Sequence, residues 1–128
     1  MTFLLDASVL IPLAVRDHEH HERATGWFLG AGGGAVCPVV EGALFRYLLR
    51  EGRSAVDAQA VVRALSEAQM IKFWPDDLSY ADVPVGSVRG HKQATDAYLA
   101  ALAASRGGQL ATLDEGLALL GIDHVVLI

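Results

Sequence analysis

Asp96 is the residue whose position first suggests chemistry. It lies near the start of a helix that the hydrophobic period predicts for residues 93–106. On a 3.6-residue period it shares a face with Leu99 and Ala103, the face that would pack on a core. Because a lone carboxylate on such a face would be costly, its position implies companions elsewhere in the chain.

Three further carboxylates have positions that suit one shared site. Glu41 lies in the first turn of a helix predicted at 39–51, again on the core-facing side. Asp6 and Asp114 each end a predicted apolar strand. In an open α/β sheet, ligands bind outside the carboxyl ends of the strands, where the connections diverge to either side. If these two strands are neighbours, both aspartates open into that crevice.

The chemistry that such a set offers is cation binding. Four carboxylates at close range repel one another, so either several take up protons or a cation lies among them. Oxygen ligands of this kind select Mg²⁺, with Mn²⁺ as the alternative. Asp6 and Asp114 could each be an ordinary helix cap instead, since each precedes a helical segment. The two acids on apolar helix faces favour the shared site.

The rest of the sequence predicts an α/β scaffold for these residues. Short apolar runs typical of buried strands alternate with helical patterns, which indicates a largely parallel sheet covered by helices. The predicted strands are residues 2–6, 34–38, 70–74, 109–114 and 124–128. The predicted helices are one broken or two short helices within 8–29, then 39–51, 54–69, 93–106 and 115–120, with a short helical turn at 79–83 inside a long connection, 75–90.

Composition indicates a single globular domain over residues 1–128. Apolar residues make up 52% and charged residues 20%, without a low-complexity tract. The longest apolar run, Ala97–Ala104, is far shorter than the roughly 18 residues of a membrane span. No basic segment precedes the first apolar stretch, so we expect no secretory signal and a cytoplasmic location. The single cysteine, Cys37, can form no internal disulfide.

The net charge of −5 argues against a protein that holds nucleic acid by phosphate neutralisation alone. It leaves nucleic acid open as a substrate, because acids gathered in one pocket serve phosphate chemistry through bound cations.

At this point the residues resemble a known family. The stretches "LLDASVLIPL", "TDAYLAALA" and "LATLDEGL", together with the inward Glu41, are similar to the successive motifs of PIN-domain ribonucleases. The resemblance is to the VapC-like toxins of bacterial toxin-antitoxin modules in particular, and it runs from residue 3 to the C-terminus. It implies a three-layer α/β/α PIN-like fold with a five-stranded, mostly parallel sheet.

The resemblance also implies which residues form the site. The acidic quartet of the family, which binds the metal and is catalytic, falls on Asp6, Glu41, Asp96 and Asp114. Ser8 and Thr112 fall where the family often has a supporting hydroxyl. Some relatives carry a further aspartate after the fourth acid, whereas here Glu115 and Gly116 follow. We therefore place Glu115 outside the direct ligands.

The implied activity is Mg²⁺-dependent endoribonuclease cleavage as the toxin of a toxin-antitoxin pair. One or two divalent ions would activate a water for in-line attack on an RNA phosphodiester, leaving a 5′-phosphate and a 3′-hydroxyl. The implied partners are the RNA, a cognate antitoxin that crosses helices near the site, and a second copy in a homodimer. Positive side chains that could meet flanking phosphates are Arg46, Arg50, Arg89, His91 and Lys92.

Other motifs favour structural roles. His18 and His21 have a spacing that zinc could use, but no third ligand is evident, and an exposed helix start capped by Asp17 is the better interpretation. "GAGGGAV" lacks the residues of a phosphate loop and indicates a helix-ending turn. Cys37 is more consistent with a small core residue than with a nucleophile.

Two other function classes stay open at the level of sequence. A Mg²⁺-dependent phosphatase or a phosphoacceptor receiver domain also places aspartates at strand ends, but a receiver would want a lysine closing its last strand, and "HVVLI" has none. A binding module with a PIN-like fold would keep the pocket without Mg²⁺-dependent cutting.

Overall fold

Five parallel strands form the centre of the structure, a computed structural model that describes residues 1–128. They are β1 (Phe3–Leu5), β2 (Gly34–Val36), β3 (Ile71–Phe73), β4 (Gln109–Thr112) and β5 (Val125–Leu127). The strand order is β3-β2-β1-β4-β5, and every pair is parallel. The chain therefore leaves β1 toward one edge of the sheet and returns to its other side through β4. The change of direction lies between β1 and β4, where open sheets of this type bind ligands.

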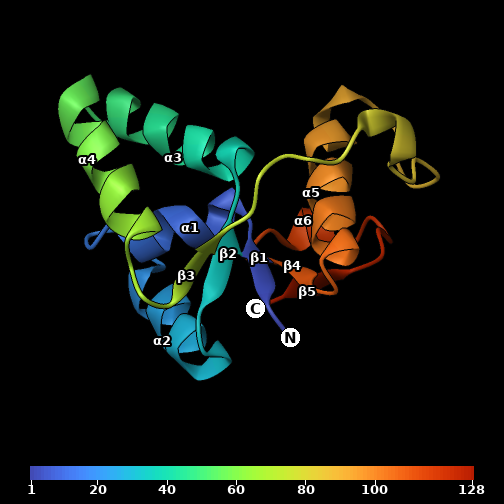
Figure 1. Cartoon of the computed structure of the whole chain (residues 1–128), viewed down its shortest axis with the longest axis horizontal. Helices are drawn as coiled ribbons and strands as arrows, with labels where there is room; N and C mark the ends of the chain where they lie inside the picture. The colour runs from blue at the N-terminus through green and yellow to red at the C-terminus, as the bar shows by residue number, and fades with distance from the viewer.

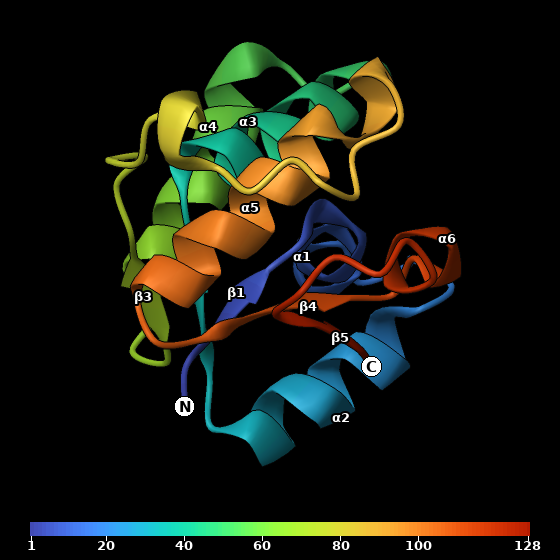
Figure 2. The ribbon, with the colours of Figure 1, turned by 90° about the vertical axis from the view of Figure 1, so that its right-hand side faces the viewer.

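Helices cover both sides of the sheet, in agreement with the predicted three-layer fold. They are α1 (Ala7–Ala14), α2 (His21–Ala31), α3 (Pro38–Arg50), α4 (Ala55–Ser66), α5 (Ala94–Ser105) and α6 (Glu115–Ala118), with the short 3₁₀ helices η1 (Tyr80–Asp82) and η2 (His91–Gln93). In Figure 1, α3 and α4 form a hairpin on one side of the molecule and α5 stands on the other. In Figure 2, α5 and α2 lie on opposite sides of the sheet.

The core is built from the apolar runs that predicted the strands. Leu4, Leu5 and Leu110 of β1 and β4 are fully buried, as are Leu44 of α3 and Leu102 of α5. Burial of each such side chain contributes about 1.5–3 kcal/mol. None of the helices has both the length and the apolar character needed to cross a membrane.

The observed elements follow the predicted ones, with two differences of detail. The strands are shorter than the predicted runs. β1, for example, ends at Leu5, and Asp6 is already the N-cap residue of α1 although its amide still bonds to β4. The prediction that Asp17 caps the second helix is wrong. That helix begins at His21, and residues 16–20 form turns before it.

The turn between α2 and β2 depends on the absence of a side chain. Gly33 has a φ of 114°, and a Cβ built on it would collide with the carbonyl oxygen of Met70. That same carbonyl accepts a hydrogen bond of 3.0 Å from the amide of Gly34, which joins the start of β2 to the segment before β3. The glycine-rich stretch thus ends a helix and admits a close backbone approach, rather than binding phosphate.

We expect Gly33→Ala to lower the free energy of unfolding by about 2–4 kcal/mol, because the backbone would have to move at a strained φ. Urea denaturation followed by circular dichroism measures it. Gly26→Ala is the matched control, since Gly26 is exposed within α2 and has no atom near its Cβ position. It should stabilise by about 0.5–1 kcal/mol. Equal midpoints for the two variants would contradict the proposed collision.

Candidate active site

Asp6 lies at the join between β1 and β4, where the sheet changes direction. Its amide donates a hydrogen bond of 3.0 Å to the carbonyl oxygen of Ala111, and its side chain is only 8% exposed. Asp6 precedes α1, but its side chain makes no capping hydrogen bond to that helix. The helix-cap alternative is therefore wrong for Asp6, and other groups hold its carboxylate.

Two hydroxyl groups hold the Asp6 carboxylate by one oxygen. Ser8 Oγ donates to Asp6 Oδ2 at 2.7 Å, and Thr112 Oγ1 donates to the same oxygen at 2.9 Å. The amides of Leu113 and Asp114 donate in turn to these hydroxyls, each at 2.9 Å. Since a hydroxyl has a single proton, this arrangement directs both protons to Oδ2. The other oxygen, Oδ1, has no hydrogen bond from the protein and can accept a ligand.

Asp96 lies in the first turn of α5 and is partly buried. Burial, and then the negative charges of Asp6 and Asp114, raise the pKa of Asp96 to about 6. The charges of Asp6 and Asp114 thus act on Asp96 from two other elements. Because burial and like charge oppose the ionisation of Asp96, a cation placed beside it would be favoured.

Asp114 serves two purposes at once. It is exposed, and its Oδ1 accepts a hydrogen bond of 3.1 Å from the amide of Leu117, which caps α6. The helix-cap alternative is therefore correct for Asp114. The cap uses only one carboxylate oxygen and fixes the side chain at the end of β4. The second oxygen therefore stays available at the rim, by which we mean the edge of the sheet where the carboxyl ends of the strands lie.

The pKa of Glu41 is affected by a different acid, Asp76. Glu41 lies in the first turn of α3, and its pKa is raised by burial and then by the negative charge of Asp76. Sequence reasoning missed Asp76. The residue follows β3 by three positions, so the rule that selected Asp6 and Asp114 at strand ends would also have selected it. In Figure 1 the segment that leaves β3 passes between the start of α3 and α5.

The four acids predicted from the sequence do not converge on a point, because Asp6 and Asp114 act on Asp96 whereas Glu41 is affected by Asp76. No three histidine, cysteine, aspartate or glutamate side chains lie close enough together to form a ready-made metal site. Repulsion among uncompensated carboxylates is a sufficient physical reason for their separation. The donors nevertheless suit a hard divalent cation, because they are all oxygens and Asp6 keeps one free.

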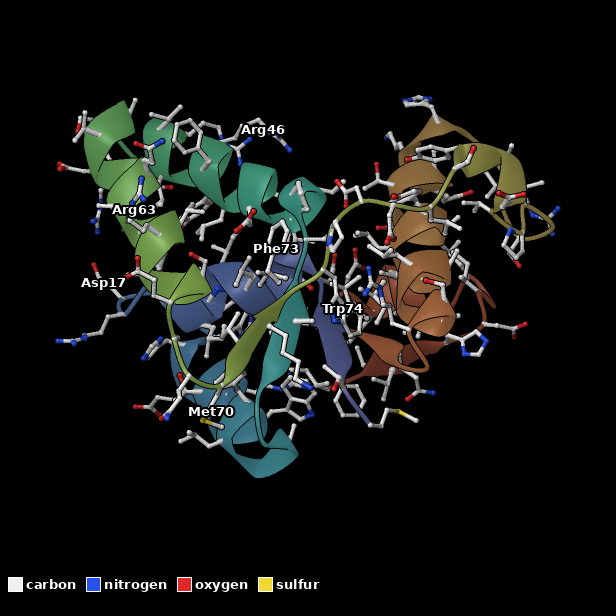
Figure 3. All side chains as sticks on the ribbon, viewed as in Figure 1. Asp17, Arg46, Arg63, Met70, Phe73 and Trp74 are labelled. Atoms are coloured by element: carbon white, nitrogen blue, oxygen red, sulfur yellow. The ribbon has the colours of Figure 1, made fainter.

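Five positive side chains lie on or next to the elements that carry Glu41 and Asp96. Arg46 and Arg50 lie on α3, and Arg89, His91 and Lys92 lie at or just before η2; all are exposed, and none forms an ion pair. The Arg46 guanidinium lies against Gly42, so its side chain runs back toward the turn that carries Glu41. Figure 3 shows Arg46 on the outer side of α3.

The other residues considered for metal binding or catalysis, His18, His21 and Cys37, have structural roles. His21 Nδ1 lies 2.8 Å from the carbonyl oxygen of Pro12, and His18 Nδ1 accepts a hydrogen bond of 3.1 Å from the amide of His20. These contacts do not form a zinc site. Cys37 is fully buried, and this burial raises the pKa of its thiol to about 11, so the thiol stays protonated at neutral pH. That agrees with a core residue rather than a nucleophile.

Comparison with known sequences places the chain in a family. The family model of the PIN domain matches residues 3–122. The whole chain aligns with Ribonuclease VapC29 of Mycobacterium tuberculosis at 54% identity and covers 97% of that protein. It is 37% identical to Ribonuclease VapC38 of the same species, over 88% of this chain and 85% of that protein.

Solved structures share the architecture. The crystal structure of Mycobacterium tuberculosis VapC20, described as a sarcin-ricin loop cleaving toxin, matches with a TM-score of 0.70 at 16% identity, over 97% of this chain and 98% of that one. VapBC2 from Rickettsia felis, bound to a DNA fragment from its promoter, matches with a TM-score of 0.67 at 12% identity, over 100% and 98%. The fold, the strand-end acids and the close sequence relatives lead to one conclusion: the chain belongs to the PIN-domain family, and within it to the VapC ribonucleases.

Proposed function

We propose that this protein is a Mg²⁺-dependent endoribonuclease, the toxin of a toxin-antitoxin pair, which hydrolyses RNA phosphodiesters with water as the nucleophile. The observation that carries the proposal is the carboxylate of Asp6. It is fixed by two hydroxyls through one oxygen and has the other oxygen free, beside Asp96. That is the arrangement expected of a ligand prepared for a cation rather than of a core ion pair. Mn²⁺ has the same ligand preference and could replace Mg²⁺.

The cation, when bound, would supply a water of lowered pKa for in-line attack and would stabilise the charge on the transferring phosphate. The protein residues then have separate tasks. Asp6, oriented by Ser8 and Thr112, presents Oδ1 to the site. Asp96, in its ionised form, would add a second negative oxygen donor. Asp114, restrained by the cap of α6, adds an oxygen at the end of β4.

Glu41 would act from the α3 side of the rim, together with its neighbour Asp76. No side chain needs to form a covalent intermediate, in keeping with the protonated thiol of Cys37. Glu115 lies in the first turn of α6, and we assign it no role in catalysis.

The RNA would lie across the rim and meet positive charge on both sides. A net charge of −5 makes the binding of phosphates dependent on these local cations. We assign Arg46 and Arg50 to phosphates on the α3 side and Arg89, His91 and Lys92 to phosphates on the α5 side. Such contacts position a strand without reading its sequence.

The regulatory partner would be a cognate antitoxin, and the active form a homodimer. The structural relative VapBC2 supports the first part, because it is a complex with an antitoxin partner, bound to a DNA fragment from its promoter. Several large apolar side chains are exposed and available for such contacts, among them Leu29, Val56, Phe73 and Leu119.

The function is tested by mapping RNA ends in cells. Inducing the wild type should create new 5′ ends that are absent after induction of Asp6→Asn, and shared profiles would contradict the assigned role of Asp6. In vitro, a substrate with a 2′-methoxy group beside the cut should still be cleaved if Mg²⁺ is present and should survive in EDTA. Loss of cleavage on methylation would identify the 2′-hydroxyl as the nucleophile instead of water.

Removing the Thr112 hydroxyl tests how Asp6 is oriented. Thr112→Val keeps the shape of the buried side chain but removes its hydrogen bond to Asp6 and leaves the Asp114 amide without an acceptor. We expect Mg²⁺ affinity or cleavage rate to fall about 10–100-fold, with a loss of about 1–3 kcal/mol in stability. Mg²⁺ titration of the cleavage rate measures the first effect. Thr112→Ser should recover most of the activity, and a serine variant as poor as the valine variant would contradict the role of the hydroxyl.

Asp96 should make the metal-free protein less stable as the pH rises. Its pKa of about 6 in the folded protein lies above the ordinary value of 3.8, so the folded state binds more protons than the unfolded state between these values. Stability is therefore lost as the pH rises through about 6. In EDTA, Asp96→Asn should exceed the wild type at pH 8 by about 1 kcal/mol, allowing for solvent screening, and should have no advantage at pH 4.

Thermal denaturation at several pH values measures this difference. Asp17→Asn, in an exposed turn, is the control and should follow the wild type at every pH. Excess Mg²⁺ at pH 8 should stabilise the wild type more than Asp96→Asn. An Asp96→Asn advantage that does not change with pH would show that the crowding of charges is not its cause.

A further inference from the structure

A cavity lies on another flank of α5. It has a volume of about 550 Å³, within the range of roughly 300–1,000 Å³ that is usual for binding pockets. None of the four acids of the candidate active site lines it. Figure 2 faces this side of the molecule, where the segment that leads into α5 crosses the helix and the α6–β5 connection runs beside it.

The floor of the cavity is apolar. It consists of the alanines of one face of α5, namely Ala97, Ala100, Ala101 and Ala104. Their small side chains leave room that larger residues would fill. Leu78 and Val88 on one wall and Ile122 on the other continue the apolar lining. The floor offers no hydrogen-bonding groups, so an occupant must be held there by apolar contact.

The walls carry two carboxylates that form no ion pair within the protein, and His124 is the one lining side chain that could carry a positive charge. Asp82 lies on the wall formed by the segment before α5, and Asp123 lies on the wall formed by the α6–β5 connection. No lysine or arginine lines the cavity, and neither carboxylate forms an ion pair or accepts a side-chain hydrogen bond. Arg106, next to the lining residue Ser105, is already bound to Asp77 at 2.8 Å.

The walls are held in place by contacts across the cavity and behind it. Ser87 Oγ donates a hydrogen bond of 3.3 Å to the carbonyl oxygen of Gly121, which ties one wall to the other. Behind the first wall, the rings of Tyr80 and Tyr98 stack with centroids 4.8 Å apart. The cavity is therefore a formed feature of the fold.

We propose that this cavity binds a segment of a partner protein that presents an arginine or lysine between apolar residues. The alkyl stem of such a side chain would lie on the alanine floor while its charge meets Asp82 and Asp123, the way long cationic side chains commonly bury their stems. The negative walls exclude the phosphates of RNA. A small polar ligand is disfavoured because the floor has no donor or acceptor to orient it.

A partner bound in this cavity would contact the helix that carries Asp96 without covering the active site. Ala97 directly follows Asp96, and Ala100 lies one helical turn further along the same helix, so the occupant would contact the helix that carries an acid of the rim. The rim itself would stay open to RNA. This proposal does not depend on the nuclease mechanism, and its test uses binding alone.

A peptide titration followed by amide chemical shifts tests the proposal. The probe is acetyl-Leu-Ala-Arg-Ala-Leu-amide, and its control replaces arginine with citrulline, which has the same shape without the charge. We expect saturable shifts at residues 97–104 and 121–124 and at least tenfold weaker binding of the citrulline peptide. Shifts spread over the surface, or equal binding of the two peptides, would overturn the proposal.

Protein variants give a second, independent readout. Asp82→Asn combined with Asp123→Asn should weaken binding of the arginine peptide to the level of the citrulline peptide. Asp17→Asn combined with Glu19→Gln changes the net charge equally at an exposed turn and should leave binding unchanged. If both pairs weaken binding alike, the attraction is a general charge effect and the cavity is not the site. An Ala101→Leu variant, which fills the floor, should abolish the localised shifts while leaving the charges intact.

Discussion

The hydrogen bonds that join Asp6 to Ser8 and Thr112 are the contacts on which the site depends. The bond from Thr112 joins β4 to the end of β1 at the place where the sheet changes direction and links residues far apart in the sequence, whereas the bond from Ser8 is local. Because both hydroxyl protons go to one carboxylate oxygen, the other is left for a ligand. The backbone amides that follow β4 fix the hydroxyls in turn, so the sheet itself orients the acid.

Charge is divided over the surface in a way that suits two different kinds of contact. The proposed active site combines carboxylates with positive side chains on the neighbouring elements, which would suit a cation and a phosphate chain together. The cavity beside α5 has two acids and no lysine or arginine, which suits a cationic partner. The helix α5 serves both, since successive faces of it carry Asp96 and the alanine floor.

Local pattern was enough to predict the scaffold and three of the acids that act together. The apolar runs predicted all five strands, and the helical periods predicted α3 to α6 and the helical stretch that the structure divides into α1 and α2. The expectation that ligands bind at strand ends identified Asp6 and Asp114. Asp96 was identified because it is a charged residue on an otherwise apolar helix face. The expectation about strand ends was not applied to β3, so Asp76 was missed although its position was equally informative. The capping role of Asp17 was wrong because the turns at 16–20 delay the helix to His21.

The sequence by itself determined which residues form strands and helices and which element ends carry acids, because those properties depend on neighbours along the chain. Only the tertiary structure decided what these acids meet. The strand order brought Thr112 to Asp6, the path of the segment after β3 brought Asp76 to Glu41, and the packing of two distant connections around α5 opened the cavity between Asp82 and Asp123. Each of these encounters joins residues far apart in the sequence, and periodicity holds no information about such distances.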